Sequence, residues 1–243
     1  MYVNAPRYLL RKYCIQKLIK DIPRGSVLEI GCGAGDLCET LFNLGFKVKG
    51  IDFSQEAIEF CRQRIKKYPP SDRLQFLLSD INQLNETFDA IMMFEVLEHI
   101  KDDQQTLQRV REHLNPGGYL LLSVPANQRW FGPSDRYAGH YRRYNKKDLI
   151  KILEDQQFKV EVIWAYGVPL ANITEHLRNW LVASKTTYDN KEEATKSSGI
   201  KRDVEARFRF FFNDFFLYPF YLTQMVFLST QLGTGYIVKA KRT

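Results

Sequence analysis

The chain has 243 residues, of which 44% are apolar and 26% are charged, and it carries a formal net charge of +7. This composition excludes a wholly disordered, a collagen-like and a membrane-spanning chain, and the length suffices for one large domain or for a domain with an added segment. The four cysteines form no CxxC pair, the four histidines are far apart in the sequence, and the N-terminus lacks the apolar core of a signal peptide. We therefore predict a cytoplasmic protein with reduced thiols and no bound metal.

The positive charge is concentrated in the second part of the chain. Residues 1–141 contain 18 lysines and arginines against 17 acidic residues, whereas residues 142–243 contain 17 against 11. Such a basic segment could face nucleic acid, an anionic lipid surface or an anionic substrate, or it could simply be solvated. No basic cluster interleaved with aromatic residues forms a recognisable nucleic-acid module, so we expect no nucleic-acid partner.

Short apolar runs and helical patterns alternate through the first 166 residues. Apolar residues at helical spacing predict a helix over 7–22, ahead of the first strand. The predicted strands are 26–31, 46–52, 74–80, 88–94, 119–125 and 158–166, and the predicted helices between them are 36–44, 54–68, 103–114 and one that begins near Asn145. Repeated strand–helix units of this kind predict an α/β fold, doubly wound around a parallel sheet.

The remainder of the chain departs from this pattern. We predict a helix over 170–182, a polar loop over 184–199, and a final strand over 235–242. Residues 207–228 are crowded with Phe and Tyr, but polar residues and a proline interrupt them too often for a membrane span. This stretch could pack as core, cover a large apolar ligand as a lid, or lie against a lipid surface.

The strongest motif is Glu29-Ile30-Gly31-Cys32-Gly33-Ala34-Gly35, where the first strand meets its helix. Glycines there allow a tight turn and close approach of a ligand, and the helix N-terminus offers free N–H groups. Asp52 ends the second strand, where an acid can accept hydrogen bonds from ribose hydroxyls. Asp36 occupies the third glycine position of a dinucleotide fingerprint, and no P-loop motif occurs. An acidic site of this kind favours a ligand with an ammonium and a sulfonium.

These motifs resemble those of class I S-adenosylmethionine-dependent methyltransferases. The matching features are the glycine motif at 29–35, Asp52 after the second strand, Asp80 after the third, the region 88–100 and the turn and strand at 114–125. The resemblance implies a Rossmann-like, seven-stranded, mostly parallel sheet whose last strand, 235–242, is antiparallel. It also implies a core of 1–166 plus 233–243 and a helical cap, 167–232, inserted before that strand. Within the family the chain is most similar to ubiquinone-biosynthesis O-methyltransferases and other small-molecule enzymes.

The resemblance further implies S-adenosylmethionine as the cofactor and assigns residues to each part of it. Glu29 would hold the methionine ammonium, Asp52 the ribose hydroxyls and Asp80 the adenine amino group. The full set of implied cofactor-binding residues is Glu29, Gly31, Gly33, Asp52, Phe53, Asp80, Ile81 and Phe94.

Residues at the end of the fourth strand narrow the class of methyl acceptor. Phe94-Glu95-Val96-Leu97 stands there in place of the [DN]PP[YF] motif of DNA amino-methyltransferases, and every cysteine precedes residue 62, which argues against pyrimidine C5 methylation. We expect a small or lipid-like organic acceptor, methylated at oxygen, with a possible peripheral membrane contact through 207–228. An RNA or protein methyltransferase, or a pseudo-enzyme that only binds the donor, remains an alternative.

Candidate acceptor-site residues lie in the loop 126–145. His140 could take a proton from a hydroxyl acceptor, whereas Arg142 or Arg143 could hold an anionic group beside Tyr144. The alternative is that His140 and Tyr144 anchor the loop and the arginines form ion pairs on the surface. His99 is a second candidate base. Because methyl transfer is a direct displacement, alignment of donor and acceptor is expected to contribute more than any base.

Overall fold

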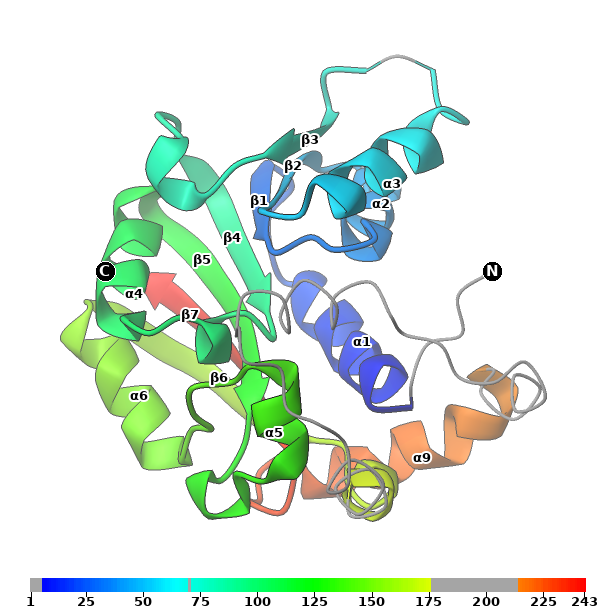
Figure 1. Cartoon of the computed structure of the whole chain (residues 1–243), viewed down its shortest axis with the longest axis vertical. Coiled ribbons are helices and arrows are strands. Elements are labelled where there is room, and N and C mark those ends of the chain that lie inside the picture. Colours follow the sequence, from blue (N-terminus) through cyan, green and yellow to red (C-terminus); the bar gives the residue numbers. More distant parts are fainter. Residues whose placement is uncertain (1–5, 70, 176–213) are drawn as a thin grey trace.

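A twisted seven-stranded sheet organises the computed structural model, which describes residues 6–69, 71–175 and 214–243 (Figure 1). The strand order is β3-β2-β1-β4-β5-β7-β6. The strands are β1 (Ser26–Ile30), β2 (Lys47–Asp52), β3 (Leu74–Leu78), β4 (Phe88–Phe94), β5 (Leu114–Pro125), β6 (Phe158–Tyr166) and β7 (Gly235–Arg242). Only β7 is antiparallel to its neighbours, β5 and β6. The predicted fold class and the antiparallel last strand are therefore confirmed.

Helices cover both faces of this sheet, as expected for a doubly wound fold. They are α1 (Pro6–Ile19), α2 (Asp36–Asn43), α3 (Gln55–Ile65), α4 (Asp103–Glu112), α5 (Pro133–Ala138), α6 (Lys146–Asp155) and α9 (Asp214–Phe227). One apolar core joins the sheet to α1, α2 and α3, with members such as Ile15, Leu41 and Ile58. A second core on the opposite face includes Leu107 of α4 and Leu153 of α6.

Local signals place most of these boundaries. The Ser54 hydroxyl accepts a hydrogen bond from Ala57 N at 3.3 Å, and the Asp102 carboxylate accepts one from Gln105 N at 3.0 Å, so a side-chain N-cap starts both α3 and α4. The prediction was wrong at β5, which begins five residues early, at Leu114. A register shift opposite Phe88 absorbs the turn residues 115–118 into the strand. The loop 126–145 also contains a short helix, α5, that we did not predict.

The described part of the insertion packs on α1 and on β6. Residues 170–175 are helical, and the predicted polar loop 184–199 and residues 207–213 lie outside the described residues. Tyr221 of α9 stacks on Tyr13 of α1 with ring centroids 4.7 Å apart. The fully buried Gln224 donates to the Leu10 carbonyl at 3.1 Å and accepts from Gly167 N at 3.3 Å. The inner face of α9 is therefore core.

The outer face of α9 remains apolar. Tyr218, Leu222 and Val226, spaced four residues apart, are 56%, 49% and 78% exposed. In the part of the chain that the structure describes, no helix combines the length and the apolar character needed to cross a membrane.

Gln224 offers a test of how α9 is attached. Gln224→Leu should lower the free energy of unfolding by about 1–3 kcal/mol, because it leaves the buried Leu10 carbonyl and Gly167 N–H without partners. Thr223→Val, at the exposed neighbouring position, should change it by less than about 0.5 kcal/mol. Denaturant unfolding of both variants measures the difference, and equal stabilities would contradict the packing.

Candidate active site

The candidate site lies at the carboxyl ends of β1, β2 and β4, where the strand order reverses direction between β1 and β4. The loop after β1 is built on Gly31, Gly33 and Gly35, whose φ angles are 69°, 51° and 74°. A Cβ on Gly31 would lie 2.6 Å from Val96 Cγ2, and one on Gly35 would lie 2.9 Å from Cys61 Sγ. Both backbone conformation and lack of space therefore require glycine at these turns.

Asp52 braces this loop from β2. Its Oδ2 accepts a hydrogen bond from Gly33 N at 2.9 Å, and its Oδ1 accepts one from Ser54 N at 2.9 Å. The side chain is 9% exposed, so the carboxylate is positioned by the backbone on both sides. Asp52 thus has a structural contact in addition to the ribose contact that the sequence suggests.

Glu29 is a buried carboxyl behind the glycine loop. The Cys38 thiol donates to its Oε2 at 2.9 Å. Burial raises the pKa of Glu29 to about 7, with the nearby Asp36 adding to the shift and the thiol hydrogen bond opposing it. A cationic ligand group would therefore meet an acid that ionises near neutral pH.

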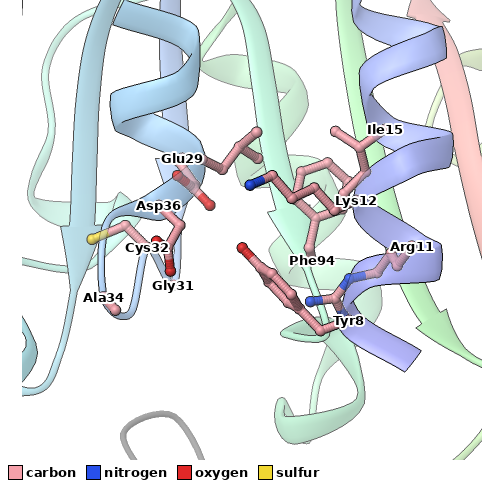
Figure 2. A pocket seen from close by; sticks show the side chains of 11 residues that line it. Tyr8, Arg11, Lys12, Ile15, Glu29, Gly31, Cys32, Ala34, Asp36 and Phe94 are labelled. Atoms are coloured by element: carbon pink, nitrogen blue, oxygen red, sulfur yellow. The ribbon is translucent and has the colours of Figure 1, made fainter. Parts of the chain in front are cut away.

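Helix α1 forms the opposite wall of a pocket, a role that we did not predict from the sequence. Figure 2 shows Tyr8 and Lys12 extending from α1 toward Glu29 and the glycine loop, with Arg11 beside them. Asp36 stands with Glu29 on the acidic wall. An acidic wall that faces a basic wall suits a zwitterion, whose ammonium would lie on the acidic side and whose carboxylate would lie on the basic side. The one feature of the sequence that could have indicated this role of α1 is the basic character of the helix directly before β1.

The predicted cofactor residues fall into three positions around this pocket. Glu29, Gly31 and Phe94 line it, and Gly33 meets Asp52 behind it. The remaining residues of the set follow β2 and β3: Phe53, which is half exposed, Asp80, which is exposed, and Ile81, which is buried. Asp80 caps a short 3₁₀ helix by accepting from Asn82 N at 2.6 Å. A backbone hydrogen bond joins the carboxyl ends of β2 and β3, since Ser79 N donates to the Asp52 carbonyl at 3.2 Å.

Directly beyond Phe94, Glu95 anchors α1 to the sheet. Arg7 Nη2 lies 2.8 Å from Glu95 Oε2, and Arg11 Nη1 lies 3.3 Å from Glu95 Oε1. The hydroxyls of Tyr166 and Ser123 donate to the same Oε1 at 2.9 and 3.0 Å. Although burial opposes the shift, Arg7 and Arg11 lower the pKa of Glu95 to about 2. This partly buried charge is therefore paired, and it holds α1 against the pocket.

Glu98, His99 and His140 meet just past Glu95. The rings of His99 and His140 stand edge to face with centroids 4.6 Å apart, and the ligand atoms of the three residues lie within 4.8 Å of one another. Burial lowers the pKa of His99 to about 3 and raises that of Glu98 well above its usual range. Both Glu98 carboxyl oxygens are buried without a hydrogen-bond partner.

These three residues could share a divalent cation, which corrects our reason for excluding one. We expected no metal because the histidines are far apart in the sequence, but folding brings His99 and His140 together. The absence of a metal stays a prediction.

The other predicted acceptor residues are engaged by the protein itself. The Arg143 side chain is fully buried, with Nη2 2.7 Å from Asp135 Oδ2 and a second ion pair to Glu175. The Tyr144 hydroxyl donates to Asp103 Oδ2 at 2.8 Å, and Arg142 Nη1 lies 2.5 Å from the same oxygen. The hydrogen bond of Tyr144 favours the loop-anchor alternative, but that alternative was wrong about Arg143, whose ion pairs are buried and not on the surface. The substrate-binding role of Arg142, Arg143 and Tyr144 stays a prediction.

The chain was compared with protein families and with individual proteins. A family model described as a methyltransferase domain matches residues 6–162. A mitochondrial ubiquinone biosynthesis O-methyltransferase of Candida albicans is 40% identical over 104 residues, which are 41% of this chain and 32% of that protein. A probable S-adenosylmethionine-dependent methyltransferase of Mycolicibacterium smegmatis is 30% identical over 60% of this chain and 56% of its own. The chain thus spans about a third to just over half of these relatives.

Solved structures share the fold. An S-adenosylmethionine-dependent methyltransferase from Mesorhizobium loti superposes with a TM-score of 0.62 at 14% identity and covers 98% of both chains. A magnesium protoporphyrin IX methyltransferase from Synechocystis, crystallised with bound S-adenosylmethionine, superposes with a TM-score of 0.57 at 16% identity and covers 98% of this chain and 79% of its own. The family model spans well over half of the residues and includes the entire pocket described above. The chain therefore belongs to the methyltransferase-domain family, among the S-adenosylmethionine-dependent methyltransferases with a Rossmann-like fold.

Proposed function

We propose that the protein transfers the methyl group of S-adenosylmethionine to a hydroxyl oxygen of a small or amphiphilic acceptor. The observation that carries this proposal is the pocket between the glycine loop and α1, which opposes Glu29 and Asp36 to Arg11 and Lys12. That polarity matches the ammonium and carboxylate of the donor's methionine part. Oxygen as the methylated atom is supported by the relatives whose names give ubiquinone biosynthesis O-methylation, in Candida albicans and Rickettsia canadensis.

The donor would lie across the carboxyl ends of three strands. Glu29 would accept from the ammonium, Arg11 and Lys12 would hold the carboxylate, and Gly31 and Gly33 would contact the methionine part through their backbone. Asp52 would accept from the ribose. The adenine would lie beyond Asp52, and the residues proposed to contact it are Phe53, Asp80 and Ile81. The methyl group would then face Phe94 and the buried residues after it.

The chemistry needed at that point is modest. The acceptor oxygen attacks the methyl carbon as the carbon–sulfur bond breaks, which leaves S-adenosylhomocysteine and one proton to remove. His140 lies past the end of β4, beside Glu98 and His99, where it could take that proton. Glu98 and His140 are buried, so electrostatic interactions at this point are screened less than in bulk water.

We also propose that the insertion 167–232 serves a lipid-like acceptor. The inner face of α9 is core, whereas Tyr218, Leu222 and Val226 form an apolar outer stripe. A charge excess of 17 basic over 11 acidic residues in 142–243 favours an anionic lipid surface as its partner. The protein would then work peripherally at a membrane.

Donor binding should depend on pH through Glu29. Because its pKa is raised to about 7, the carboxylate is lost as the pH falls through 7, and donor affinity should fall with it. Glu29→Gln should bind the donor about 10- to 100-fold more weakly at pH 7.5, the range for a hydrogen bond to a charged group, and should lose the pH dependence. Calorimetry between about pH 5.5 and 7.5 avoids the donor's own amine, which titrates near 7.7–8.0. A pH-independent affinity in the unchanged protein would contradict this role.

His140 should be needed for turnover but not for donor binding. With a panel of catechols and phenols, with and without an isoprenoid tail, His140→Ala should lower kcat by about 10²–10⁴-fold at unchanged donor Kd. His113→Gln is the matched control, because His113 lies at the opposite end of the sheet and bonds the Leu84 and Arg109 carbonyls.

The same assay distinguishes the alternatives. Donor binding without transfer to any acceptor would indicate a pseudo-enzyme, and transfer to RNA or protein would overturn the acceptor class. Turnover that a chelator abolishes and magnesium restores would overturn the prediction of no metal.

The outer stripe of α9 should bind anionic vesicles. Replacing Tyr218, Leu222 and Val226 together by serine should weaken co-sedimentation with phosphatidylglycerol vesicles by about tenfold or more. The reason is that the variant no longer has these three apolar side chains to transfer from water into the lipid on binding. Leu44→Ser with Leu78→Ser removes similarly exposed apolar side chains elsewhere and should have little effect. Failure of the unchanged protein to co-sediment would contradict the membrane proposal.

A further inference from the structure

Asp135 is a buried carboxylate that touches His140 directly. Its side chain is 1% exposed, and its Oδ1 lies 2.9 Å from His140 Nδ1. Arg143 Nε lies 2.9 Å from both of its oxygens, and Gly132 N donates to Oδ2 at 2.8 Å. Every contact that fixes Asp135 therefore comes from the same loop, α5 and its flanks.

These contacts decide which nitrogen of His140 carries hydrogen. Asp135 is surrounded by donors, because Arg143 Nε and Nη2 and Gly132 N all point at its two oxygens, and a guanidinium paired with a carboxylate in this way holds it as the anion. An ionised carboxylate only accepts hydrogen bonds, so Nδ1 of His140 must be the donor. In a neutral imidazole the other nitrogen, Nε2, then keeps its lone pair.

The backbone holds the ring in place from both sides. His140 N donates to the Asp135 carbonyl at 2.9 Å, and the next residue, Tyr141, donates from N to the Glu98 carbonyl at 2.8 Å. The ring consequently stands against His99, at the buried cluster past the end of β4. A lone pair presented there could accept the acceptor's proton or bind a cation, and both uses require this orientation.

We propose that Asp135 is a positioning residue that fixes the Nδ1–H form of His140 and thereby presents the Nε2 lone pair to the methyl-acceptor site. Arg143 and Glu175 extend this arrangement, because the charges alternate along Glu175–Arg143–Asp135 and Asp135 then contacts the neutral His140. The proposal deepens the proposed function and rests on it for the role of His140. It also explains why Arg143 is buried inside the protein instead of facing a ligand.

The first test reads the tautomer and needs no acceptor. With ¹⁵N-labelled protein at pH 8, histidine side-chain spectra should show His140 protonated at Nδ1 and bare at Nε2. The chain has only four histidines, and His140→Gln identifies the signal that disappears. A His140 ring that carries hydrogen on Nε2, alone or with Nδ1, overturns the proposal. Because the unchanged protein is used, this result does not depend on whether a variant folds.

The second test separates positioning from a general effect on the loop. Asp135→Asn keeps an oxygen for Gly132 N but removes the charge, and it should lower kcat about 10- to 100-fold at unchanged donor Kd. In a His140→Ala background the same change should cost nothing further, because Asp135 acts through His140. An equal loss in both backgrounds overturns the proposal.

Asp103→Asn is the matched control for this cycle. It removes the carboxylate that binds Arg142 and Tyr144, two residues of the same loop as His140. Its effect on kcat should therefore be the same in the unchanged protein and in the His140→Ala background. If no acceptor is methylated at all, the proposed function fails, and the tautomer measurement still decides the role of Asp135.

Discussion

The partly buried pairing of Glu95 with Arg7 and Arg11 is the interaction on which the arrangement of the site depends. Glu95 sits at the end of β4 with a φ of 58°, and it also accepts from hydroxyls on β5 and β6. Removing either side would leave a partly buried charge without its partner and would weaken the attachment of α1. The ion pair therefore ties α1 to three strands at once, and α1 becomes a wall of the pocket instead of a loosely packed N-terminal helix.

That attachment gives the pocket its polarity. The sheet side contributes Glu29 and Asp36, and α1 contributes Arg11 and Lys12. Neither wall alone suits a zwitterion, since a single sign of charge would repel one of its two ends. Burial adds a second property, because it raises the pKa of Glu29 to about 7, and the proposed donor contact would then be coupled to proton release.

The donor side and the acceptor side of the site differ in how far the family model covers them. The model covers 6–162 and so includes the glycine loop, Asp52 and the cluster of Glu98, His99 and His140, but it stops before α9. The acceptor would be selected by the later part of the chain, where the outer stripe of α9 faces away from the core. A shared donor site with a variable cover is consistent with a fold that serves many acceptors.

The sequence alone predicted all seven strands, most of the helices between them, and the positions of the glycine loop and Asp52 at strand ends, because strand period, helix caps and tight turns are local properties of neighbouring residues. It missed the short helix α5 and the early start of β5. It also indicated His140 as a candidate base, a role that stays a proposal. Only the tertiary structure decided that Arg143 and Tyr144 are held by Asp135 and Asp103, that α1 lines the pocket, and that His99 meets His140. These contacts join residues from separate loops and helices, and a charged side chain in a sequence does not reveal which opposite charge it will meet. Burial then lowers the pKa of His99, because the free energy of ionisation depends on surroundings that form only when the chain folds.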